Sequence, residues 1–151
     1  MTTMPTCELC ELLDNIGEDD DTSTVIWCNA RVAVLAVDDA AYPGFCRVVW
    51  QVHVKEMSEL DTAQRALIME VVWRVELALR AVMLPEKINL ASLGNMTPHV
   101  HWHVIPRYLD DAHFPQPIWA AAQRLTPPAV LAARRALLPQ LHAAIVQGLS
   151  V

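Results

Sequence analysis

Three histidines alternate with apolar residues in one short segment, at His99, His101 and His103. In a β-strand, residues two apart point to the same face, so this segment would present a row of imidazoles about 6–7 Å apart. Val100 and Trp102, which lie between them, would then face a core. A neutral imidazole is both a nucleophile near pH 7 and a common zinc ligand, so the spacing alone leaves these two uses equally open. A merely structural row is disfavoured, because aligned titratable groups cost stability.

A second group able to do chemistry is the pair Cys7-Glu-Leu-Cys10. Two cysteines at this spacing supply half of a four-coordinate zinc site, which needs two further ligands. Taken alone, the pair could also be two buried thiols or a redox dithiol. Cys28 and Cys46 lie in apolar segments and are expected to be core residues.

The hydrophobic pattern predicts the elements that must position these groups. Segments rich in Val, Ile, Leu and Trp predict five strands, at residues 24–29, 31–37, 45–54, 87–93 and 99–106. Between the third and fourth, apolar residues from Leu60 to Val82 follow the 3.6-residue period of an amphipathic helix. Ser58 is the expected N-cap and Pro85 the expected stop. This order predicts an α+β domain on a mostly antiparallel sheet of about five strands with one long helix.

Two other segments differ in character. Residues 14–23 are acidic and polar, which predicts a solvated loop rather than a metal site. From residue 113 onward prolines interrupt the chain, and a run from Ala129 predicts a helical tail that Pro139 breaks into two short helices. We therefore expect a domain over residues 1–112 and a C-terminal extension over residues 113–151, packed on the same domain or on a partner subunit.

The composition is that of a globular protein, with 54% hydrophobic and 19% charged residues. The formal net charge is −6 and no Lys/Arg run exists, so long DNA or RNA is not an expected partner. A single nucleotide is compatible, because backbone N–H groups and a few polar side chains can hold a phosphate. The first residues lack the pattern of a secretory signal, and charged residues interrupt the apolar stretch at 66–84. We expect no membrane span and a cytoplasmic protein with reduced thiols.

The segment His99-Val-His-Trp-His-Val-Ile105 resembles the His-φ-His-φ-His-φ-φ signature of the histidine triad family, in which φ is apolar. The resemblance continues over residues 89–95 and to Arg107, and covers about the first 110 residues. It implies the histidine triad fold and a reaction in which the middle histidine, His101, attacks the α-phosphorus of a nucleotide. Water then hydrolyses the covalent nucleotidyl-histidine. His103 would hydrogen-bond phosphate oxygens, and it favours hydrolysis because related transferases tend to have glutamine at this position.

The same resemblance implies further substrate contacts. Asn89 and the turn that contains Asn95 should approach the phosphate. Asp38, at the end of the second strand, should bind the ribose hydroxyls, with Asp39 as a rival.

The chain departs from the family pattern at three positions. Asn95 stands where many relatives carry Gln, and Met96 stands where they carry Ser or Thr, so a hydroxyl contact to the phosphate is missing. A Gly-His pair common in relatives is Gly44-Phe45 in this chain. The replacements for these contacts are left open by the sequence.

Zinc-containing members of the family hold their metal with two N-terminal cysteines, a histidine that aligns with His53 and the first histidine of the triad. Carried over, this implies a structural zinc on Cys7, Cys10, His53 and His99. A closed Cys2His2 site leaves no position for a reacting water, so its role would be to pin the N-terminus beside the histidine strand. The cysteine pair resembles the dinucleoside polyphosphate hydrolase-like branch of the family.

The function implied is a homodimeric hydrolase that cleaves at the α-phosphorus of a dinucleoside polyphosphate, a nucleoside phosphoramidate or an adenylated conjugate. One alternative is a nucleotide-binding regulatory protein with weak activity. Another is a metalloenzyme in which His99, His101 and His103 jointly hold a catalytic metal.

Overall fold

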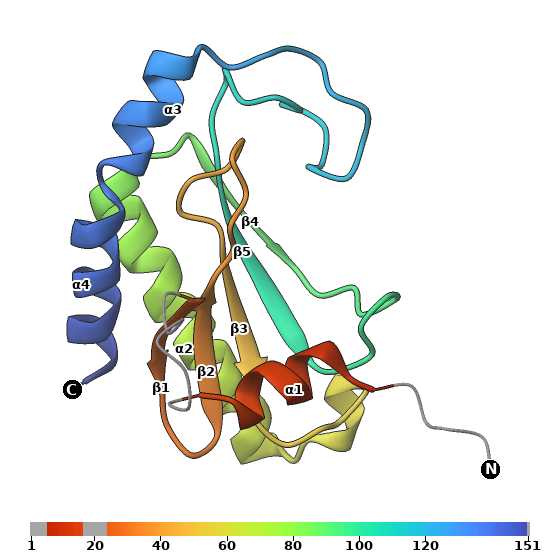
Figure 1. Ribbon diagram of the computed structural model, residues 1–151. Helices are drawn as coiled ribbons and strands as arrows, with labels where there is room; N and C mark the ends of the chain where they lie inside the picture. Colours follow the sequence, from red (N-terminus) through yellow and green to blue (C-terminus); the bar gives the residue numbers. More distant parts are fainter. Residues whose placement is uncertain (1–5, 17–23, 151) are drawn as a thin grey trace.

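The computed structural model describes residues 6–16 and 24–150 of the 151-residue chain. Its centre is one five-stranded antiparallel sheet in the order β1-β2-β3-β5-β4 (Figure 1). The predicted α+β class is confirmed, and every observed strand overlaps a predicted one. The strands are β1 (Val25–Cys28), β2 (Val32–Ala36), β3 (Cys46–Trp50), β4 (Lys87–Ala91) and β5 (His101–Arg107).

Two strand ends differ from the prediction at the point where the histidines begin. β3 ends at Trp50 rather than at Val54, and β5 begins at His101 rather than at His99. The His99 N–H donates to the Thr97 carbonyl at 2.8 Å, which turns the chain just before the strand. His99 is therefore positioned by a turn and not by the sheet ladder.

A long helix, α2 (Thr62–Met83), covers one face of the sheet and ends before Pro85, as predicted. Its N-cap is Asp61, so the expectation of Ser58 is wrong. The Asp61 carboxylate accepts from the Gln64 N–H at 2.8 Å, and the Gln64 side chain accepts from the Asp61 N–H at 2.9 Å. This reciprocal pair satisfies two donors at the helix start, whereas Ser58 lies in a preceding 3-10 turn.

The C-terminal tail forms two short helices, α3 (Pro128–Arg135) and α4 (Leu138–Leu149). The predicted break is confirmed, but Pro139 lies in the first turn of the second helix instead of ending the first. Proline fits the first turn of a helix, where its missing N–H would have no intrahelical partner. α4 packs against α2, and Leu141 and Ile145 belong to the main core (Figure 1).

The stretch Pro128–Leu149 is long and apolar enough, by length and composition, to cross a membrane. It is bent into helices of 8 and 12 residues, and a membrane-spanning helix needs about 20. Its second half also contributes to the core, so the feature is weak evidence for a membrane span.

The opposite face of the sheet carries a short helix that the sequence did not predict, α1 (Glu8–Asp14) (Figure 1). It buries two leucines against β2 and β3: Leu9 and Leu13 pack with Ala33, Leu35 and Val49. The acidic segment 14–23, expected as a loop, begins at the last residue of α1, and residues 17–23 lie outside the described residues. The sheet thus separates an α2/α4 face from an α1 face.

Candidate active site

The side chains around β5 alternate between these two faces, as the histidine spacing predicts. Val100 and Val104 belong to the core under α2. His101 is paired in register with Val49, which packs under Leu9 of α1, so His101 and His103 lie on the α1 face. His101 is only 5% exposed.

His99 is directed toward the N-terminal cysteines. Its Nε2–H donates to the Trp50 carbonyl at 2.5 Å, and because a carbonyl only accepts, the proton lies on Nε2. The Nδ1 lone pair then lies 3.5 Å from the Sγ atoms of both Cys7 and Cys10, and 3.2 Å from Nδ1 of His53. Metal-binding histidines commonly donate their second N–H to a carbonyl in this way.

The geometry of this cluster fits a tetrahedral metal site. Its four potential ligand atoms lie within 4.8 Å of one another. Nδ1 of His99 lies 3.2–3.5 Å from the two Sγ atoms and from Nδ1 of His53, and Sγ of Cys10 lies 3.3 Å from Nδ1 of His53. Zinc bonds of about 2.0–2.3 Å in a tetrahedron place ligand atoms about 3.3–3.8 Å apart. Two thiols and two imidazoles are a donor set that zinc favours, so the four residues could hold a metal ion.

The local sequence explains why the two thiols point together. Cys7 is the N-cap of α1 and Cys10 lies one turn further, on the same side of the helix. Burial and the neighbouring Cys7 raise the pKa of the Cys10 thiol to about 11. The Cys10 thiol therefore resists ionisation unless a cation lies beside it, which is the chemistry of a metal site.

The three triad imidazoles do not converge on one point. His99 directs Nδ1 to the cysteines, while His101 directs Nδ1 to a backbone carbonyl. Among the described residues, the cluster that could hold a metal contains His99 but neither His101 nor His103. This geometry gives no support to a catalytic metal shared by the triad.

The tautomer of His101 is set by the preceding turn. Its Nδ1 lies 2.6 Å from the carbonyl oxygen of His99, so Nδ1 carries the proton and donates it. Nε2 is left with its lone pair. Burial lowers the pKa of His101, which keeps the imidazole neutral at pH 7.

His103 lies among aromatic rings. Its centroid is 5.0 Å from His101, 5.5 Å from Phe45 and 5.2 Å from Trp119. Burial, followed by the neighbouring His101 and Arg47, lowers the pKa of His103 to about 4. His103 is therefore neutral at pH 7 and can donate a hydrogen bond without carrying a charge.

A cavity of about 400 Å³ opens beside His101 and His103. Asn95 lines this cavity with the two histidines, so these three predicted site residues are brought together. Met96 also lines it but is 97% exposed. The other lining residues are Arg47, Leu93, Gly94, Thr97 and Trp119.

Asn89 lies in the neighbouring cavity, which shares Leu93 and Trp119 with the first. Its side-chain oxygen accepts from the Arg107 guanidinium at 2.7 Å. That guanidinium also forms a buried ion pair with Asp111 at 2.8 Å. Although burial alone would raise the pKa of Asp111, bonds from Arg107 and backbone N–H groups hold it well below its usual range. This network fixes how Asn89 is oriented.

The two candidate ribose contacts differ in their surroundings. Asp38 is exposed and lines neither of these cavities. Asp39 accepts from the Ala41 N–H at 2.9 Å, so its carboxylate is engaged in its own loop. The structure therefore does not bring Asp38 to the histidines directly.

Sequence reasoning missed Arg47 and Trp119. Arg47 is the Cα partner of His103 across β3 and β5, a relation that depends on strand register. Trp119 reaches His103 from the C-terminal segment. The only available signal for Arg47 was a charged residue at an inward position of an apolar strand.

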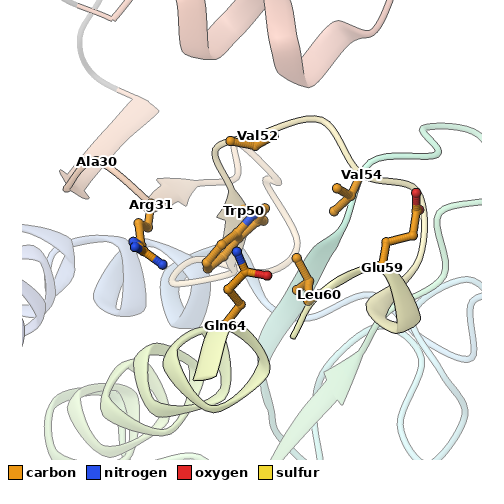
Figure 2. A pocket seen from close by; sticks show the side chains of 8 residues that line it. All are labelled: Ala30, Arg31, Trp50, Val52, Val54, Glu59, Leu60 and Gln64. Atoms are coloured by element: carbon orange, nitrogen blue, oxygen red, sulfur yellow. The ribbon is translucent and has the colours of Figure 1, made fainter. Parts of the chain in front are cut away.

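Another cavity, of about 350 Å³, lies at the far end of β3 and is lined by none of the predicted site residues. Figure 2 shows its side chains, which come from the turn between β1 and β2, the end of β3, the segment that follows β3 and the start of α2. Trp50 and Leu60, which line it, belong to the core under α2, so it lies away from the histidine face. We assign it no chemistry.

Comparison with known proteins agrees with this fold and histidine arrangement. The model of the HIT domain family matches residues 18–110. A histidine triad protein from Bradyrhizobium japonicum is 31% identical, covering 82% of this chain and 87% of its own, with a TM-score of 0.66. One from Sinorhizobium meliloti is 26% identical, covering 97% and 100%, with a TM-score of 0.67.

A zinc-bound histidine triad family protein from Mycobacterium smegmatis shares the fold, with 19% identity, coverage of 92% and 97%, and a TM-score of 0.61. The search of curated proteins gives no match. The fold, the histidine strand and the family match together define the class: the chain belongs to the histidine triad (HIT) family.

Proposed function

We propose that the protein is a hydrolase that cleaves nucleotides at the α-phosphorus, with His101 as the nucleophile. The observation that carries the proposal is the tautomer of His101. Donation of Nδ1–H to the His99 carbonyl leaves the Nε2 lone pair free on a neutral side chain that lines a cavity.

The reaction proceeds in two displacements. His101 Nε2 forms a bond to the α-phosphorus while the bond from phosphorus to the leaving group breaks, and the leaving group keeps that electron pair. Water then attacks the same phosphorus, loses a proton to solvent and releases the nucleoside monophosphate as the P–N bond breaks. The first displacement is easier than direct attack by water because the imidazole is the better nucleophile. The second is easier because the imidazole is a good leaving group and takes back the electron pair of the P–N bond.

The neighbouring residues bind and orient the phosphate. His103 is neutral and donates a hydrogen bond to a phosphate oxygen. Asn95 contributes from the turn that lines the same cavity, and Asn89 contributes its amide N–H because Arg107 occupies its oxygen. Asp38 binds the ribose hydroxyls.

The substrate class is a nucleotide with a displaceable group on its α-phosphorus. Dinucleoside polyphosphates, nucleoside phosphoramidates and adenylated conjugates all present this centre. Assay of nucleoside monophosphate release across the three groups distinguishes them.

We also propose that Cys7, Cys10, His53 and His99 hold a structural zinc. The support is the lone pair of His99 directed at the two thiols, and separations that suit a tetrahedron. When bound, such a metal neutralises the thiolates and ties α1 to the turn before β5. The turn in which the His99 N–H donates to the Thr97 carbonyl precedes β5, and its His99 carbonyl orients His101.

The proposed assembly is a homodimer. β4 is an edge of the sheet, and apolar side chains are exposed on it and on α2, including Leu90, Trp73 and Leu77. An unpaired strand edge beside apolar surface favours association with a second copy. Light scattering on the purified protein tests this.

The decisive test of the mechanism traps the covalent intermediate. The protein is quenched during turnover of an α-labelled dinucleoside polyphosphate, with His101→Ala as the control. A phosphoramidate survives alkali and is cleaved by acid, so label should remain on the wild-type protein at high pH and leave at low pH. Label on a serine or cysteine peptide, or none on protein under any condition, contradicts the proposal.

A further inference from the structure

Three buried side-chain nitrogens have no hydrogen-bond partner among the described residues: Arg47 Nε, Trp102 Nε1 and His103 Nδ1. Trp102 packs against the core under α2, on the other face of the sheet. Arg47 and His103 both line the cavity beside His101. A buried polar atom without a partner costs free energy, and two residues that carry such atoms line one cavity, which indicates a ligand that supplies hydrogen-bond partners there.

Strand register explains why Arg47 reaches this cavity. Arg47 lies opposite His103 in the antiparallel pair of β3 and β5. Directly opposed residues have Cβ atoms about 4.5–5.5 Å apart on the same face. On its other side Arg47 is paired with Leu35, which offers no polar group. Arg47 therefore shares with His103 the face of the sheet that carries the cavity.

The electrostatic surroundings leave the charge of Arg47 available. Burial lowers the pKa of Arg47 and the Glu8 carboxylate raises it, but arginine stays charged at neutral pH. Within residues 6–16 and 24–150, no carboxylate lies at salt-bridge distance from it. A partly buried arginine that forms no salt bridge keeps its planar fork of N–H donors available to a phosphate group.

The cavity otherwise lacks positive charge. Arg47 is the only lysine or arginine among the residues that line the cavity. Met96 offers no hydroxyl where many relatives have one, and it projects into solvent. Among the residues that line the cavity, Arg47 is therefore the one that can supply a permanent positive charge to a phosphate at His101.

We infer that Arg47 is the phosphate-binding cation of this site, donating from its guanidinium to oxygens of the phosphate that His101 attacks and so replacing the hydroxyl donor that Met96 cannot supply. The inference rests on the proposed function for the identity of that phosphate. It assigns the positive charge at the site to a residue of β3.

Binding of three probes tests this assignment: adenosine 5′-monophosphate, inorganic phosphate and adenosine. Calorimetry is run on wild type, Arg47→Met and Arg47→Lys, with Arg80→Met as the matched control. Arg80 is an exposed residue of α2 outside the cavity, and its loss changes the net charge equally. Arg47→Met should weaken binding of both phosphates on the order of 10–100-fold and leave adenosine unchanged. Arg47→Lys should lie between, since it keeps the charge without the fork.

A measurement on the wild-type protein covers the case in which Arg47→Met does not fold. In ¹⁵N–¹H spectra, one arginine Nε–Hε signal should shift on titration with inorganic phosphate, and the same signal should be missing in Arg47→Lys. If the shifting signal persists in Arg47→Lys, if wild type binds neither phosphate, or if Arg47→Met binds both as tightly as wild type, the assignment is wrong.

The outcome separates this inference from the proposed function. Arg47-dependent phosphate binding in a protein that turns over none of the three substrate groups would retain the inference and reject the hydrolase. Turnover through His101 with affinity and rate unchanged in Arg47→Met would retain the hydrolase and reject the inference.

Discussion

The two ends of the histidine row are built in different ways. At the His99 end, four residues from distant parts of the chain meet within 4.8 Å, and all four were candidates from the sequence. At the His103 end, Asn95 lines the cavity but Asp38 does not, and Arg47 and Trp119 occupy positions that no motif indicated.

The difference reflects the interactions involved. A metal requires several short bonds at one point, so its ligands are few, of restricted type and recognisable as a motif. A phosphate accepts hydrogen bonds from any donor that reaches it, including backbone N–H, asparagine, histidine or arginine. A donor missing at one position, such as Met96, can therefore be replaced from another strand. The following predictions test this contrast.

The largest effect is expected at His101, the middle histidine of the row. His101→Ala should lower turnover by on the order of 10⁴-fold or more, because it removes the nucleophile. The variant should remain folded, since this side chain lines the cavity and is not part of the cluster of Cys7, Cys10, His53 and His99. Release of nucleoside monophosphate and the circular dichroism spectrum are the measurements, with His142→Ala as a control on α4. Retention of a tenth of the activity would exclude His101 as the nucleophile.

Cys10→Ser should remove a ligand from the proposed metal site at the His99 end and leave the nucleophile His101 in place. Metal analysis of the wild type should give close to one zinc per chain, and the variant should lose most of it. Loss of a ligand should lower Tm by about 10 °C, corresponding to about 3 kcal/mol for a chain of this size. The folded fraction should still turn over substrate.

Cys28→Ser is the matched control, because Cys28 is exposed on β1 and outside the cluster. Equal zinc in Cys10→Ser and wild type, or zinc lost instead in His101→Ala, would place the metal elsewhere.

The stability of the His103 end should depend on pH. The folded-state pKa of His103, about 4, lies below the usual 6.5 of a histidine, so the unfolded chain takes up the proton first as the pH falls. Stability should be fully present above pH 6.5 and decline toward pH 4, by up to about 3 kcal/mol from this group.

Urea unfolding of wild type and His103→Leu at pH 7.5 and 4.5 measures this effect. The pH dependence should be shallower in the variant. Loss of metal in acid affects both proteins, so the difference isolates His103. Identical pH dependence would show that His103 has an ordinary pKa in the folded state.

The smallest effect is expected at the ribose contact. Asp38→Asn should raise KM about five- to tenfold, as for loss of one exposed charged hydrogen bond, and leave kcat nearly unchanged. Asp39→Asn should change KM less, because the Asp39 carboxylate already accepts from Ala41. A larger effect at Asp39 would transfer the ribose contact to that residue.

The local pattern of the sequence was sufficient to predict most of the fold and to predict which histidines share one face of β5. Alternation around β5 and the 3.6-residue period of α2 are properties of neighbouring residues, so they can be read without knowing the partner strand. The same holds for the break before α4. Prediction was wrong for the cap of α2, where Asp61 and Gln64 satisfy each other's backbone donors and the serine three residues earlier cannot.

The tertiary structure alone decided how those histidines are oriented and what surrounds them. The Trp50 and His99 carbonyls select opposite nitrogens as donors, so one histidine turns its lone pair to the cysteines and the other leaves Nε2 free. Register places Arg47 across from His103. Both depend on backbone hydrogen bonds between segments far apart in the chain, and a spacing rule within one segment carries no information about them.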